Sequence, residues 1–115
     1  MREIKFRCWY NNQMNKVQDI SFRHKTINLF GADIIKFEDG ILMQYTGLKD
    51  KNGVEIYEGD IIDISYDEAI IKNAVIEYHG ASFYACTNND MWELDNYFDI
   101  EVIGNIYEYL KENGE

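Results

Sequence analysis

Few side chains could act as nucleophiles, and only two imidazoles could serve them as bases. Nucleophilic catalysis needs a nucleophile, a base that takes its proton and a group that orients the base. The candidates are Ser21, Ser65, Ser82, Cys8 and Cys86, with His24 and His79 as bases. None of them lies in a nucleophile elbow or a similar motif. We therefore expect a protein without catalytic residues.

The spacing of the potential metal ligands gives equally little support for metal chemistry. Two isolated cysteines and two isolated histidines lack the spacing of a zinc site. Five carboxylates on adjacent segments could gather oxygen ligands for Mg²⁺, namely Asp60, Asp63, Asp67, Glu68 and Glu77. Acidic neighbours arise by chance in so acidic a chain, however, and no glycine-rich phosphate loop accompanies them. We expect no metal, no cofactor and no enzymatic activity.

Charge is distributed unevenly along the chain, whose formal net charge is -10. Up to Gly53 there are nine basic and six acidic residues, a balance of +3, whereas from Val54 onward two basic residues face fifteen acidic ones, a balance of -13. One interpretation is a well-hydrated acidic surface, because net charge bears on solubility rather than on fold. The other is electrostatic complementarity, either between subunits or with a basic partner protein.

The stretch from residue 90 to residue 101 combines aromatic and acidic side chains that could form a partner-binding surface. The candidate residues are Asp90, Trp92, Glu93, Asp95, Tyr97, Asp99 and Glu101, with Phe98 beside them. A basic protein would be attracted to such a surface, and mimicry of the charge of DNA is one form of this hypothesis. In the alternative interpretation, Trp92 and Phe98 are core residues and the carboxylates only hydrate the fold.

Two further kinds of association remain open. The opposite charges of the two halves favour head-to-tail contacts between copies, so we expect a homo-oligomer. A nucleic-acid-binding face is the main alternative function, formed by Arg2, Lys5, Arg7, Arg23, Lys25 and Lys36 with Trp9 and Phe22. The acidic second half would repel phosphate, however, and nucleic-acid-binding domains usually carry a stronger basic surface. Binding to nucleic acid is therefore the less favoured prediction.

The chain carries no apolar run long enough to span a membrane, since charges interrupt every hydrophobic stretch. Residues 1–7 alternate charged and apolar side chains, which is unlike a signal peptide. We expect a cytoplasmic protein without membrane association. Cys8 and Cys86 fall in apparent strands, where a small buried thiol is the usual interpretation.

Alternation of apolar and polar residues with a period of two dominates the sequence and predicts short strands. Ile4, Phe6 and Cys8 face one side of a first strand, and further strands are expected at 17–22, 25–30, 34–37, 61–64, 70–78, 82–86 and 101–107. The segment from Trp92 to Phe98 fits neither the strand nor the helix period. The residues from Tyr109 onward form a polar tail, either frayed or a single helical turn.

Turn residues separate these strands. Asn11-Asn12 and His79-Gly80 are expected turns, and Asn52-Gly53 supplies the positive φ angles of a tight hairpin. Short strands without a long amphipathic helix predict an all-β, barrel-like fold of antiparallel strands whose second half resembles an SH3 barrel. The length is that of a single domain, with lobes at 1–53 and 54–108 and a polar tail at 109–115.

The centre of the chain contains two distinctive segments, Leu42-Met43-Gln44-Tyr45-Thr46-Gly47-Leu48-Lys49-Asp50-Lys51-Asn52-Gly53 and Glu55-Ile56-Tyr57-Glu58-Gly59-Asp60-Ile61-Ile62. They are flanked by Arg2-Glu3-Ile4-Lys5-Phe6-Arg7, Trp9 and Glu101-Val102-Ile103-Gly104-Asn105-Ile106-Tyr107-Glu108. Together these stretches are the basis of a resemblance to the YopX family of phage and prophage proteins. It implies a small, mainly β protein that acts in the cytoplasm of a bacterial host, where its basic partner would be a host or phage protein. The family has no established biochemical activity, so no functional residues carry over.

Overall fold

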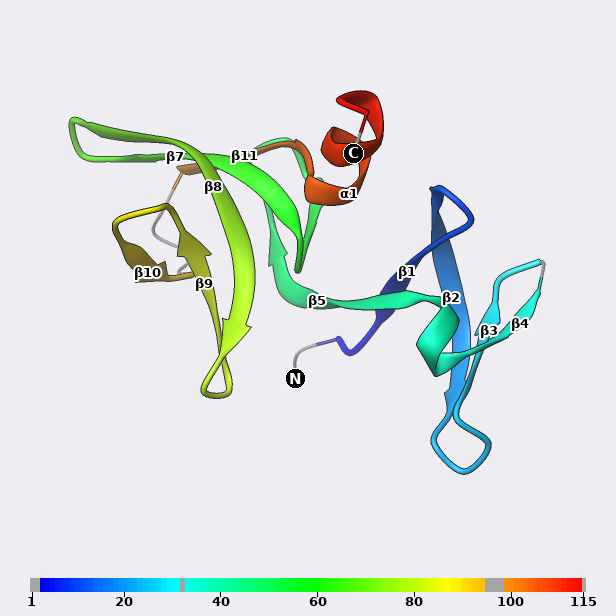
Figure 1. The fold of residues 1–115 in the computed structure, drawn as a ribbon. Coiled ribbons are helices and arrows are strands. Elements are labelled where there is room, and N and C mark those ends of the chain that lie inside the picture. Colours follow the sequence, from blue (N-terminus) through cyan, green and yellow to red (C-terminus); the bar gives the residue numbers. More distant parts are fainter. Residues whose placement is uncertain (1–2, 32, 95–98, 115) are drawn as a thin grey trace.

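The computed structural model describes residues 3–31, 33–94 and 99–114, which form two antiparallel sheets and one short helix (Figure 1). The first sheet has the strand order β4-β3-β2-β1-β5-β6. Its strands are β1 (Phe6–Tyr10), β2 (Gln13–Ser21), β3 (Thr26–Leu29), β4 (Ile34–Lys36), β5 (Ile41–Lys49) and β6 (Glu55–Tyr57), with a 3-10 turn at Phe37–Asp39. Because β6 pairs with β5, the first sheet extends past Gly53 to Tyr57.

The second sheet has the strand order β10-β9-β8-β7-β11 and is followed by the helix α1. These elements are β7 (Asp60–Tyr66), β8 (Ala69–His79), β9 (Ser82–Cys86), β10 (Met91–Glu93), β11 (Asp99–Asn105) and α1 (Ile106–Glu112). The all-β prediction is confirmed. The barrel is not closed in the described part of the chain, because β10 and β11 are opposite edges of the sheet, and the SH3-like description stays a prediction. No helix in the described segments is long and apolar enough to cross a bilayer.

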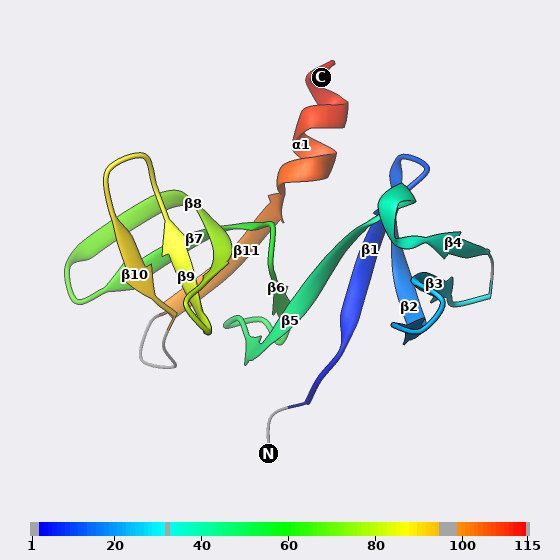
Figure 2. The ribbon, with the colours of Figure 1, turned by 60° about the horizontal axis from the view of Figure 1, so that its bottom comes forward.

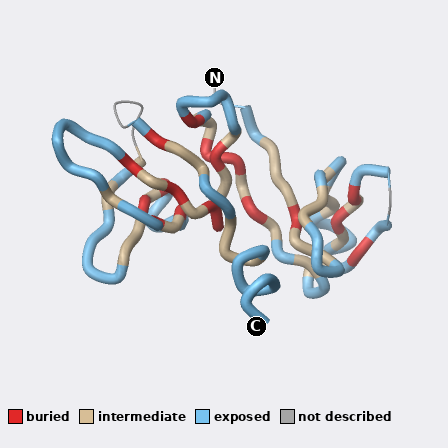
Figure 3. The backbone as a smooth tube through the Cα atoms, turned by 90° about the horizontal axis from the view of Figure 1, so that it is seen from above, coloured by how far each residue is buried: buried red, intermediate tan, exposed pale blue. Residues whose placement is uncertain are grey.

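The buried apolar residues fall into two clusters (Figure 3). The larger cluster lies at the second sheet but also includes Ile56 of β6 in the first sheet. In β7 the period-two pattern places Ile62 and Ile64 in the core of the second sheet, with Ala74 and Ile76 of β8 beside them. The first sheet has a smaller cluster, formed by Cys8, Ile27, Leu29 and Ile35. The predicted burial of the Cys8 thiol is thus confirmed.

The turns follow the sequence with two differences. The β8–β9 turn is formed by Gly80 and Ala81 instead of the expected His79-Gly80, because His79 still pairs with Ser82. Asn11 and Asn12, at φ 55° and 60°, form the two-residue turn between β1 and β2, in which both residues adopt positive φ and match the strand twist. In the β5–β6 turn only Gly53 has positive φ, so the expected pair of positive angles at Asn52-Gly53 is wrong for Asn52. The turn instead closes by a hydrogen bond from the N–H of Gly53 to the carbonyl of Asp50 at 3.0 Å.

The end of the chain corrects another expectation. The strand predicted to reach Tyr107 ends at Asn105, where the side-chain oxygen accepts hydrogen bonds from the N–H groups of Tyr107 and Glu108. An asparagine in this position satisfies amides that have no partner inside the helix, so it starts a helix and stops the strand. The helix therefore begins before the polar tail assigned to 109–115.

A buried ion pair joins the two sheets. The Arg7 Nη2 atom of β1 donates to the Asp60 carboxylate of β7 at 2.8 Å and to the carbonyl of Glu58 at 3.2 Å, while its guanidinium stacks over the Tyr57 ring. The other carboxylate oxygen of Asp60 accepts the N–H of Tyr57 at 2.8 Å. Asp60 is only 2% exposed. Burial raises the pKa of its carboxyl group, and the Arg7 charge partly offsets this effect.

Gly59, next to this ion pair, lets the chain pass closely between the sheets. It has φ +84°, and an added Cβ would lie 3.2 Å from the Met43 sulfur and 3.3 Å from the Tyr107 ring. The Gly59 N–H donates to Ile76 and its carbonyl accepts from Ile106, each at 2.9 Å. A single residue therefore contacts β5, β8 and α1.

Replacement of Gly59 should be more damaging than replacement of Gly53. Both have nearly equal positive φ, +84° and +81°, but nothing lies within 4 Å of a Cβ at Gly53. We expect Gly53→Ala to cost about 1 kcal/mol from backbone strain alone and Gly59→Ala about 1 kcal/mol or more beyond that, because Met43 and Tyr107 must move. Urea unfolding of both variants measures the difference, and equal costs would show that the close approach is unimportant.

The Arg7 and Asp60 side chains should show strong energetic coupling. We expect Arg7→Met and Asp60→Asn each to lower the free energy of unfolding by about 3 kcal/mol, since each leaves a buried charge without its partner. The double variant should lose clearly less than the two single losses combined. The exposed pair of Lys72 with Asp63, at 3.2 Å, is the control and should couple by about 0.5 kcal/mol or less. Additive losses at Arg7 and Asp60 would refute the coupling.

Candidate functional site

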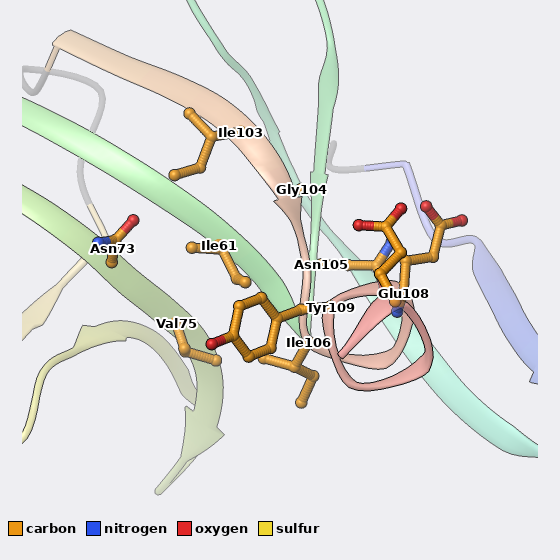
Figure 4. Close-up of a pocket in the computed structure, with 10 residues that line it drawn as sticks. Ile61, Asn73, Val75, Ile103, Gly104, Asn105, Ile106, Glu108 and Tyr109 are labelled. Atoms are coloured by element: carbon orange, nitrogen blue, oxygen red, sulfur yellow. The ribbon is translucent and has the colours of Figure 1, made fainter. Parts of the chain in front are cut away.

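A cleft of about 510 Å³ lies between α1 and the outer face of the second sheet (Figure 4). Ten residues line it, namely Ile61, Asn73, Val75, Ile103, Gly104, Asn105, Ile106, Glu108, Tyr109 and Glu112. The Tyr109 ring extends from α1 toward Ile61 and Val75, with Ile106 beside it. The cleft therefore has an apolar floor and an aromatic side chain from the helix.

The strand registers extend this floor into an apolar row across the sheet. Gly104 of β11 lies opposite Ile61, Ile61 opposite Val75, Val75 opposite Cys86, and Cys86 opposite Met91. Residues that lie directly opposite each other point to the same face of an antiparallel sheet. Gly104 has no side chain, and no atom lies within 4 Å of the position that a Cβ would take there. This leaves room at the end of the row that α1 covers.

Two side chains of this cleft are well exposed although they are large and apolar. Ile103 is 47% exposed and Tyr109 is 55% exposed. The lining contributes two exposed carboxylates, Glu108 and Glu112, and no Lys or Arg. The cleft thus combines apolar surface with negative charge.

Several contacts to the rest of the protein hold α1 in position over the sheet. The Ile106 N–H donates to the carbonyl of Gly59, and the Tyr107 ring stacks with Trp9 of β1 at 5.9 Å between centroids. The Lys111 Nζ atom donates to the carbonyl of Asn12 in the β1–β2 turn at 2.9 Å. Figure 2 shows the helix above the region where the two sheets meet. The first sheet therefore helps to form one wall of a cleft on the second.

The structure divides the predicted partner-binding residues between opposite edges of the second sheet. Asp90, Trp92 and Glu93 lie at β10, whereas Asp99 and Glu101 lie in β11. Asp95 and Tyr97, with Phe98, lie outside the described residues. Trp92 is half-buried and lies opposite the fully buried Ala85, so it points to the core side of the sheet.

The two edges differ in their accessibility. The outer hydrogen-bonding groups of β11 are occupied by the β5–β6 turn, because the Lys51 N–H donates to Ile100 and the Val102 N–H donates to the Asp50 carboxylate, at 2.9 and 3.0 Å. The same carboxylate accepts the N–H groups of Asn52 and Val54. Among the described strands none pairs with the outer side of β10, which is only three residues long. Short edge strands resist unwanted pairing with other chains.

The five carboxylates considered as Mg²⁺ ligands do not form one site. Asp60 is buried against Arg7, and Asp63 accepts hydrogen bonds from Lys72 and from the N–H of Asn73. Asp67 and Glu68 lie in the exposed β7–β8 turn. Glu77 is instead within 2.7 Å of the His79 imidazole.

A different set of potential metal ligands is brought together by the β8–β9 hairpin. Glu77, His79 and Cys86 each offer a ligand atom, and these atoms all lie within 4.8 Å of one another. Cys86 is a free, half-buried thiol, and burial, with the nearby Glu77 charge, raises its pKa. Sequence spacing gave no sign of this cluster, because the register of two strands and not a local motif creates it.

Asp50 should make stability depend on pH in the acid range. Burial opposes its ionisation, but the N–H groups of Val102, Val54 and Asn52 outweigh burial and lower the pKa of its carboxyl group. A lowered pKa in the folded state adds stability above the pKa of the unfolded chain, and this stability is lost as the pH falls through the folded pKa.

The corresponding variant is Asp50→Ala. We expect it to lower the free energy of unfolding at neutral pH by about 2 to 3 kcal/mol, because three main-chain donors lose a charged acceptor. The difference from the parent protein should shrink as the pH falls below about 4. Urea unfolding at several pH values measures it, and a pH-independent difference would show that the charge of Asp50 contributes nothing.

Comparison with known proteins places the chain in a family. The model of the YopX protein family matches residues 3–110. Among solved structures, the chain is similar to protein EF1440 from Enterococcus faecalis, with 26% sequence identity, a TM-score of 0.54 and complete coverage of both chains. A comparison with curated protein sequences gives no match. Because the family match spans nearly the whole chain, this protein belongs to the YopX family.

Proposed function

We propose that this protein is a non-catalytic binding module that holds a basic, apolar-bearing segment of another protein in the cleft between α1 and the second sheet. The observation that carries the proposal is the combination of exposed Ile103 and Tyr109 with the carboxylates of Glu108 and Glu112 in one cleft. Apolar side chains of a partner would fill the floor, while its Lys or Arg residues would pair with the carboxylates.

The charge of the second lobe supports this choice of partner. The chain from Val54 onward carries a balance of -13, and its field extends beyond the cleft. Asp99 and Glu101 of β11 precede the cleft residue Ile103 on the same strand, so these two of the sequence-predicted partner residues lie near the proposed interface. Asp90 and Glu93 at the other edge would attract a basic partner without contacting it in the cleft.

The nucleic-acid alternative loses three of its expected contact residues. Arg7 is occupied by Asp60 and by the Glu58 carbonyl, and Trp9 stacks on Tyr107. Lys5 forms an ion pair with Glu55. Arg2 lies outside the described residues. Arg23, Lys25 and Lys36 remain near the exposed Phe22, and they form only a small basic area for binding phosphate.

The family resemblance supports a proposal for the biological setting. We propose that the protein is an accessory protein of phages or prophages that acts in the cytoplasm of a bacterial host on a host or phage protein. A second copy of the chain is another possible occupant of the cleft, because its first lobe is more basic than its second. Binding of defined peptides separates these partners.

The direct test uses short fluorescent peptides in which Lys or Arg alternates with Leu or Val. We expect saturable binding that weakens with added salt and that shifts the amide resonances of Val75, Ile103 and Tyr109. Tyr109→Ala should weaken binding by about 10-fold, because an aromatic side chain at the centre of an interface typically contributes more than about 1 kcal/mol. A peptide with Glu in place of its basic residues should not bind.

The matched controls separate local charge from total charge. The double variant Glu108→Gln, Glu112→Gln should weaken binding severalfold, whereas Asp67→Asn with Glu68→Gln, which removes the same charge from the β7–β8 turn, should have little effect. Equal effects of the two pairs, or resonance shifts confined to other surfaces, would refute the cleft as the site. Concentration-dependent shifts without peptide would assign the cleft to a second copy, and shifts of Lys25 and Lys36 on adding an oligonucleotide would favour the nucleic-acid alternative.

A further inference from the structure

The β8–β9 hairpin brings three chemically different ligand groups to the outer face of the second sheet. Glu77 and His79 are two residues apart on β8 and therefore point to the same face. Cys86 lies opposite Val75 on β9, and Val75 shares the outer face with Glu77, so the thiol is diagonal to the carboxylate. The three ligand atoms lie within 4.8 Å of one another.

We propose that Glu77, His79 and Cys86 form a site for a divalent transition-metal ion of the zinc type on the outer face of the β8–β9 hairpin. A thiolate, an imidazole and a carboxylate are the three ligand types that zinc accepts together, whereas Mg²⁺ and Ca²⁺ prefer oxygen ligands alone. Binding forms a metal–sulfur bond, and the thiol proton passes to solvent. The proposal is independent of the cleft and its partner.

The geometry needs only side-chain adjustment. Zinc–ligand bonds of about 2.0 to 2.3 Å at tetrahedral angles place neighbouring ligand atoms about 3.4 to 3.6 Å apart. The Glu77 Oε1 and His79 Nε2 atoms, at 2.7 Å, would have to separate by less than 1 Å, as judged from that spacing of about 3.5 Å. Both side chains are about half exposed, at 46% and 51%, so each has a side that is not packed against the protein. The backbone of the hairpin holds Cys86 in place.

Three protein ligands leave a fourth position open. The site opens into a depression of about 330 Å³ that Thr87, Asn88, Asn89, Asp90 and Met91 also line. Water would complete the coordination there, as it does at zinc ions with three protein ligands. The His79 ring lies 6.2 Å from the ring of Tyr84, which limits its orientation on one side.

Cobalt substitution tests the site directly. Co²⁺ is titrated into the full chain under a phosphine reductant, and the thiolate-to-cobalt charge-transfer absorption is measured. We expect saturation at one ion per chain and displacement of the band by zinc. Cys86→Ser should abolish the band, His79→Ala should abolish saturable binding, and Glu77→Gln should weaken it by about 10-fold.

The controls are chosen from the same residue types elsewhere in the chain. His24→Ala removes the other histidine, which is exposed in the first lobe, and should leave the titration unchanged. Cys8 is kept in every variant and is fully buried. We therefore expect that its thiol contributes no cobalt absorption, so any band is due to Cys86. Circular dichroism checks that each variant is folded. Absence of the band in the parent protein, or its persistence in Cys86→Ser, would overturn the proposal.

Discussion

The buried ion pair of Arg7 with Asp60 is the constraint on which the arrangement of the two sheets depends. Arg7 belongs to the first sheet and Asp60 begins the second, and the Asp60 carboxylate also holds the N–H of Tyr57 at the crossing between them. The attraction within a buried ion pair is largely offset by the cost of removing both charges from water. Removal of one partner is nevertheless strongly destabilising, because it leaves the other charge buried without a partner. The ion pair therefore mainly fixes the crossing of the chain, meaning residues 57–60, where the chain passes from the first sheet to the second. The two clusters of buried apolar residues supply most of the apolar burial.

The position of α1 follows from that crossing. Gly59, between Glu58 and Asp60, offers its carbonyl to the first amide of the helix, and its lack of a side chain admits the Tyr107 ring. The helix in turn places Tyr109 over Ile61 and Val75, which creates the cleft. An interaction between sheets thus determines a surface feature on only one of them. The turn at Asp50 is a second contact between the sheets, since the Asp50 carboxylate accepts the N–H of Val102 in β11.

Local sequence predicted the elements well but predicted few of the contacts between them. The Asn11-Asn12 turn and the alternation of Ile62 and Ile64 could be predicted because φ preferences and the period of two act over a few residues. Arg7 and Asp60 are 53 residues apart, so local sequence does not predict their ion pair and suggests only a potential metal ligand at Asp60. The cluster of Glu77, His79 and Cys86 was missed for the same reason, because it depends on a strand register. Asparagine is a common residue at the start of a helix, so Asn105 carries a local signal for α1, but the alternating residues before it favour continuation of the strand.

Native-state hydrogen exchange tests most directly whether the crossing of the chain and α1 form one unit. Three amides report on it, namely Tyr57 bound to Asp60, Ile106 bound to Gly59 and Val102 bound to Asp50. If the ion pair fixes the helix, the three amides share one free energy of opening and lose protection together in Asp60→Asn. Exchange of Ile106 at the rate of an exposed amide, while Tyr57 stays protected, would contradict this account.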